Sequence, residues 1–65
     1  MTITIIDYNV GGVFIYPFPQ DKANDESFIS DFLTEKGHKE SDCFFMTNDV
    51  LVLSVLGVET TLTNL

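Results

Sequence analysis

The chain has 65 residues, and its ten Asp and Glu against three Lys, with no Arg, give a formal net charge of −7. This charge argues against direct binding to a nucleic-acid backbone, because almost no cations are present to displace counterions from the phosphates. Its single cysteine, Cys43, excludes an intramolecular disulfide. We therefore expect one small domain, residues 1–65, with a thin stability margin. Self-association or docking on a larger partner would compensate for it, and an unaided monomer with a good core is the alternative.

The N-terminal segment lacks the basic and small-residue features of a signal peptide. The longest apolar run, residues 50–58, is about half of the roughly 20 residues that a membrane helix needs. A small chain with one cysteine also fits a reducing compartment. We expect no membrane association and a cytoplasmic location, which for a viral protein is the host cytoplasm.

Residues 2–7 predict a first strand, because Ile3 and Ile5 alternate with threonines. The glycine-rich residues 9–12 predict a turn, and residues 13–16 predict the returning strand of a hairpin. Two prolines end that strand and leave Phe18 between them. We expect Phe18 to fold back as a core plug, with an exposed apolar anchor formed by Tyr16 and Phe18 as the alternative.

Residues 25–36 predict the helix. Their apolar residues follow the i, i+1, i+4, i+5 spacing of one helical stripe: Phe28, Ile29, Phe32 and Leu33. Asn24 is the predicted N-cap, followed by two acids that suit the positive end of the helix dipole. Gly37 suits the position just after the last helical residue. The sequence therefore predicts a helix with one apolar face and one outward face that carries acids, which is either an ordinary solvated face or an acidic contact surface.

The last third of the chain predicts further strands. Residues 43–47 predict a third strand, and Asn48 with Asp49 predicts a tight turn into residues 50–56, which would make these two strands a hairpin. The apolar run 50–56 predicts a strand buried on both faces, and residues 58–62 predict a short fifth edge strand. The expected class is α+β, with one helix packed on a small, mostly antiparallel sheet in the order ββαββ.

No motif specifies a chemistry. His38 and Cys43 lie only five residues apart, but a zinc site needs at least three protein ligands. The spacing of the residues does not indicate which side chain would be the third ligand. Cys43 is predicted to be a small core residue rather than a nucleophile. The segment around Gly11 and Gly12 lacks the lysine and the following helix of a phosphate-binding loop. We therefore expect no catalytic residues, no metal, no cofactor and no enzymatic activity.

Two functions fit this composition. The first is an inhibitor whose acidic surface docks on the basic surface of a larger, nucleic-acid-binding protein. Such a chain is similar in kind to phage- or plasmid-encoded antagonists, including anti-CRISPR proteins and nucleic-acid mimics. The predicted contacts are Asp25, Glu26, Asp31, Glu35, Glu40 and Asp42.

The second function is an assembly module that forms a homodimer or a subunit contact. Its contacts would be the apolar strands or the segment containing Tyr16 and Phe18. Self-association with little salt dependence would identify it, whereas partner capture that is lost at high salt would identify the acidic inhibitor.

Overall fold

Five strands and one helix form the fold, and the computed structural model describes residues 1–63. The helix and strands, in chain order, are β1 (Thr2–Asp7), β2 (Gly12–Pro17), α1 (Glu26–Glu35), β3 (Cys43–Asn48), β4 (Val50–Val55) and β5 (Val58–Thr63). Short 3₁₀ turns at Gln20–Lys22 and Glu40–Asp42 flank the helix. The predicted α+β class, the element order and the fifth strand are confirmed.

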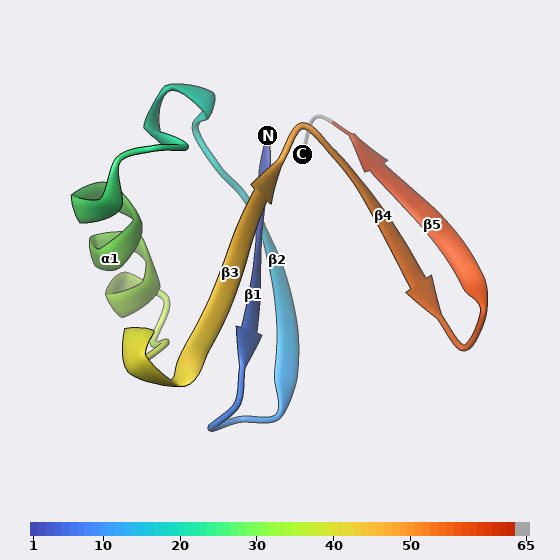
Figure 1. The fold of residues 1–65 in the computed structure, drawn as a ribbon, viewed down its shortest axis with the longest axis horizontal. Coiled ribbons are helices and arrows are strands. Elements are labelled where there is room, and N and C mark those ends of the chain that lie inside the picture. The colour runs from blue at the N-terminus through green and yellow to red at the C-terminus, as the bar shows by residue number, and fades with distance from the viewer. Residues whose placement is uncertain (64–65) are drawn as a thin grey trace.

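The strands form two separate sheets. β1 is the centre of a three-stranded antiparallel sheet in the order β2-β1-β3, and β4 pairs only with β5. Figure 1 shows α1 on one side of the three-stranded sheet and the β4–β5 hairpin on the other, diverging from β3 beyond their shared connection. Among residues 1–63, no helix is long and apolar enough to cross a membrane.

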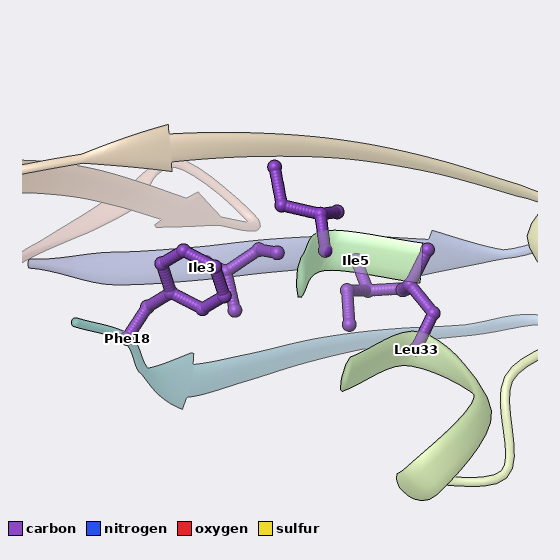
Figure 2. Close-up of a cluster of buried hydrophobic side chains, with 5 residues drawn as sticks. Ile3, Ile5, Phe18 and Leu33 are labelled. Carbon is purple, nitrogen blue, oxygen red and sulfur yellow. The ribbon is translucent and has the colours of Figure 1, made fainter. Parts of the chain in front are cut away.

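The hydrophobic core lies between β1 and α1. Ile3 and Ile5 on one face of β1 meet Ile29 and Leu33 of the helix, and Phe18 closes one end of the cluster. Figure 2 shows Ile3, Ile5, Phe18 and Leu33 gathered between the sheet and the helix. Ile3, Ile5 and Leu33 are fully buried, as the alternation of the strand and the stripe of the helix predict.

The helix begins one residue later than predicted. Asp25, not Asn24, is the N-cap, and its carboxylate accepts a hydrogen bond of 3.0 Å from the backbone N–H of Phe28. Asp25 has the extended backbone of an N-cap and lies three residues before that N–H, which is the reach that capping requires. The C-terminal prediction is confirmed, because Gly37 takes a left-handed φ of 83° immediately after the cap residue Lys36.

Two predictions for the last third of the chain were wrong. β3 pairs with β1 rather than with β4, because the bend at Asp49 sends the chain away from the sheet that β3 has joined. β4 is not buried on both faces either: Leu51 is buried, but Val50 and Val52 are each more than half exposed. The apolar run is a strand, as predicted, but residues 1–63 do not provide side chains that pack on both of its faces.

Candidate interaction surface and a buried Asp–His–Cys cluster

The face of the three-stranded sheet that points away from α1 is apolar and partly open. Ile6 stands between Val13 of β2 and Phe44 of β3 in the register, so the three side chains form one row across the sheet. All three are exposed, at 42% for Ile6, 58% for Val13 and 64% for Phe44. In contrast, Thr2 and Thr4 on the same face are buried, and they lie nearer the connection between β3 and the β4–β5 hairpin. The half of this face that is far from that connection therefore has no side chains packed on it among residues 1–63.

This face also contains a cavity of about 220 Å³, lined by Thr4, Ile6, Phe44, Phe45 and Met46. The lining is almost wholly apolar. The Thr4 hydroxyl is buried and has no hydrogen-bond partner among the described residues. A buried hydroxyl without a partner costs free energy, so a group that fills the cavity and offers a donor or an acceptor would be favoured there.

The β4–β5 hairpin is the second apolar surface. Five of its large hydrophobic side chains are more than half exposed: Val50, Val52, Val55, Leu56 and Val58. Leu56 is 100% exposed at the two-residue turn, where it takes a left-handed φ of 52° beside Gly57 at 81°. That conformation favours Asn or Gly over Leu, so local turn preference does not account for leucine at the tip.

Charge is distributed unevenly along the described chain. Residues 43–63 contain only two charged side chains, Asp49 and Glu59, whereas all three lysines lie between Lys22 and Lys39. The molecule therefore has a charged half, built around α1, and an apolar half. We use "apolar half" for the exposed hydrophobic residues of the outer sheet face and the hairpin: Ile6, Val13, Phe44, Met46, Val50, Val52, Val55, Leu56 and Val58.

The six acidic residues that the sequence predicts as partner contacts lie in the charged half but differ in their surroundings. Glu26, Asp31 and Glu35 are exposed on α1. Asp25 caps the helix and lies 4.0 Å from the Lys22 ammonium group. The exposed Glu40 accepts a hydrogen bond of 3.0 Å from Ser30, and Asp42 is partly buried. Among the described residues, the carboxylates of Asp25 and Glu40 have a hydrogen bond or ion pair, whereas those of the three exposed helix acids and of Asp42 have none.

The alternative anchor, Tyr16 with Phe18, is not an exposed apolar pair. Phe18 is only 5% exposed, so the predicted core plug is what the structure shows. It contacts the rings of Phe28 and Phe32 edge-on, at centroid distances of 5.6 and 5.2 Å. Tyr16 is partly buried and its hydroxyl is 3.0 Å from Nε2 of His38. Because both side chains are engaged inside the fold, neither is free to anchor a partner in this conformation.

His38 lies in a buried polar cluster with Asp7. Its Nδ1 is 2.7 Å from Oδ2 of Asp7, and the two residues are 6% and 2% exposed. An ionised carboxylate only accepts hydrogen bonds, so Nδ1 carries the proton and donates it. The other carboxylate oxygen, Oδ1, accepts from the backbone N–H groups of Asn9 and Val10. Asp7 therefore joins the β1–β2 turn to the segment that follows α1.

Cys43 completes this cluster. One ligand atom from each of Asp7, His38 and Cys43 lies within 4.8 Å of the other two. Burial raises the pKa of the Cys43 thiol, and the negative charges of Asp7 and Asp42 raise it further. The neutral thiol is a poor nucleophile, which agrees with the predicted structural role. Sequence reasoning considered His38 with Cys43 but missed Asp7, which is 31 residues from His38.

The hydrogen bond from His38 is the largest effect on the pKa of Asp7 and lowers it below its ordinary value of 3.8. Burial raises this pKa, and the backbone N–H groups of Val10 and Asn9 lower it further, so that the net change is downward. A carboxyl group with a lowered pKa adds stability above its unfolded-state pKa, and that stability is lost as the pH falls through the folded-state value. We expect the melting temperature of the Asp7→Asn variant to fall less than that of wild type below about pH 4. Circular dichroism melts in metal-free buffer test this, and equal acid losses would contradict it.

The chain matches no protein-family model, and the searches of curated proteins and of solved structures also return no match.

Proposed function

We propose that the protein is a non-enzymatic assembly module that forms a homodimer through its apolar half. The observation that supports this proposal best is the β4–β5 hairpin, which exposes large hydrophobic side chains on both faces and pairs with neither edge of the three-stranded sheet. A two-stranded hairpin is marginally stable in water unless something packs on it. A hairpin with five exposed large hydrophobic side chains therefore needs a cover.

The dimensions of the chain support the same conclusion. A compact monomer of this length has an expected radius of gyration of about 10.7 Å, whereas this chain has 11.9 Å. Its accessible surface is 4502 Å², against about 4200 Å² for a compact protein of this mass. The excess fits a hairpin that is not packed against the domain.

A second copy of the chain suits this surface. Two apolar halves can meet with little repulsion, since residues 43–63 carry only Asp49 and Glu59. A stable interface needs about 800 Å² from each partner, which is less than a fifth of the 4502 Å² that each chain exposes. The two-fold arrangement lays each hairpin on the outer sheet face of the other copy, so that both apolar surfaces are buried together.

In this arrangement, the tip of the hairpin of one copy fills the cavity on the outer sheet face of the other copy. Leu56 offers a fully exposed side chain, and the turn backbone beside it offers donors and acceptors to the unpartnered Thr4 hydroxyl. The dimer leaves both α1 helices, with their acidic side chains, on its outside. The proposal places this dimer in the cytoplasm, because a chain with one cysteine has no disulfide pair of its own.

Leu56→Asn separates the folding role of the turn from its binding role. Asn followed by Gly57 is the preferred pair for a turn with two left-handed residues, so the folded monomer should be as stable as wild type or more so. The lost side chain should weaken dimerisation by about tenfold or more. Sedimentation velocity over a dilution series, with thermal melts, measures both. A variant that dimerises as tightly as wild type would place Leu56 outside the interface.

The acidic inhibitor is a second candidate, and it is favoured by one observation. Asp31 and Glu35, one helical turn apart, form an exposed acidic surface on α1, and Glu26 is exposed in its first turn. Figure 1 shows α1 on the side of the three-stranded sheet opposite the hairpin. The partner of this acidic surface would be a larger protein with a basic surface, such as a nucleic-acid-binding protein that a phage or plasmid antagonist blocks. The two functions are compatible, because a dimer formed through the apolar half presents this acidic surface twice.

The double charge reversal Asp31→Lys with Glu35→Lys tests the second candidate. Both side chains are exposed, so folding should be little affected, while capture of a basic protein from nuclease-treated lysate should fall and wild-type capture should weaken with salt. Quantitative mass spectrometry of the eluates gives the comparison. Equal capture by the reversed variant would remove this surface as the binding site.

A further inference from the structure

The Asp–His–Cys cluster joins three segments that are distant in the sequence or separated by a loop. Asp7 ends β1, His38 follows the glycine after α1, and Cys43 begins β3. Their ligand atoms lie within 4.8 Å of one another, and Asp7 and His38 are almost fully buried. Carboxylate, imidazole and thiol are three different donor types, and together they suit zinc and similar late first-row metals rather than magnesium or calcium.

The groups behind Asp7 and His38 already fix the orientation of these two donors. Oδ1 of Asp7 is occupied by the two backbone N–H groups of the turn, which leaves Oδ2 facing Nδ1 of His38. Nε2 of His38 faces the Tyr16 hydroxyl at 3.0 Å. In metal sites, partners of this kind fix the ring and the carboxylate so that the free atoms point at the ion. The Phe14 ring, 4.7 Å from the imidazole centroid, adds an apolar wall.

We propose that Asp7, His38 and Cys43 bind a divalent metal ion of the zinc type. The ion takes the place of the proton between Nδ1 and Oδ2. That imidazole proton moves to Nε2, where it is donated to the Tyr16 oxygen, and the thiol proton of Cys43 is released to solvent. Zinc bonds of about 2.0–2.3 Å place tetrahedral donors about 3.3–3.8 Å apart, so small side-chain rotations bring the three atoms to the ion. Water completes the fourth position.

This site would act on the stability of the fold. Its three ligands connect the end of β1, the segment after α1 and the start of β3, so a bound ion would add coordination bonds to the core, sheet and hydrogen-bond contacts that already join these segments. Small domains commonly use a metal in this way. The proposal does not depend on dimerisation, because Asp7, His38 and Cys43 lie outside the apolar half.

Cobalt titration of the metal-free, reduced full-length protein tests the proposal. Co²⁺ should bind with a stoichiometry of one, show a thiolate charge-transfer band in the near ultraviolet and visible bands of tetrahedral coordination, and be displaced by Zn²⁺. Cys43→Ser should lose the charge-transfer band, and His38→Gln should weaken binding at least about tenfold. Tyr16→Phe, which removes only the hydroxyl behind the ring, should weaken binding about tenfold. Asp21→Asn, an exposed acid outside the cluster, should bind like wild type.

Melting curves keep the test decisive if a substitution disturbs the fold. Zn²⁺ should raise the melting temperature of wild type and Asp21→Asn, since an ion that binds only the folded state stabilises it, and should leave that of Cys43→Ser unchanged. Failure of the wild-type protein to produce the charge-transfer band, or equal Co²⁺ affinity in wild type and Cys43→Ser, would overturn the proposal. Either result would leave the cluster as a hydrogen-bonded element of the fold.

Discussion

Replacing Phe44 with Glu is expected to convert the dimer to a monomer at concentrations where wild type is dimeric. Phe44 is 64% exposed, lines the outer-face cavity and stands at the edge of the apolar row across the sheet. A buried aromatic residue at the centre of an interface contributes at least about 2 kcal/mol, and an unpaired carboxylate in the same place adds a desolvation cost. Dimerisation should therefore weaken at least about 30-fold.

A matched control separates this effect from a general effect of surface charge. Val10, in the β1–β2 turn, is also 64% exposed but lies outside the apolar half. Val10→Glu should dimerise like wild type when both variants are compared by sedimentation velocity at equal concentrations. Equal dimerisation of Phe44→Glu and wild type would exclude the outer sheet face from the interface.

Leu33→Ala is expected to cost about 2–5 kcal/mol of unfolding free energy, because it opens a cavity at a fully buried position between α1 and β1. Domains are stable by only about 0.05–0.15 kcal/mol per residue, so this loss is a large part of the total for 65 residues. Leu33→Met, which conserves volume, should cost less than about 1.5 kcal/mol.

Urea denaturation followed by circular dichroism, at several protein concentrations so that dimerisation is accounted for, measures both Leu33 variants. If Leu33→Ala were as stable as wild type, the core between β1 and α1 would not be the source of stability.

The sequence predicted the elements whose signals are local. The alternation of Ile3 and Ile5, the helical stripe ending at Leu33 and the stop at Gly37 each depend on neighbouring residues, and each is confirmed. Strand partners depend on contacts between distant residues. Nothing near Phe44 indicates that β3 pairs with β1 rather than with β4, so the hairpin prediction followed the turn signal at Asp49 and was wrong.

The candidate site depends even more on distant contacts. Asp7 has the sequence context of an ordinary residue at the end of a strand, and only the fold brings it beside His38 and Cys43. The apolar run of β4 is a different case. Its pattern predicts burial on both faces, whereas the chain described here leaves Val50 and Val52 exposed. A second copy that covers the hairpin would give this run the burial that its pattern predicts.

The mass of the purified wild-type protein in solution, measured by sedimentation equilibrium over a range of concentrations and at low and high salt, tests the central claim most directly. The proposal predicts a salt-insensitive mass of twice the 7.3 kDa of one chain. A mass of 7.3 kDa up to the highest soluble concentration would contradict the homodimer and leave the exposed hairpin without its proposed occupant.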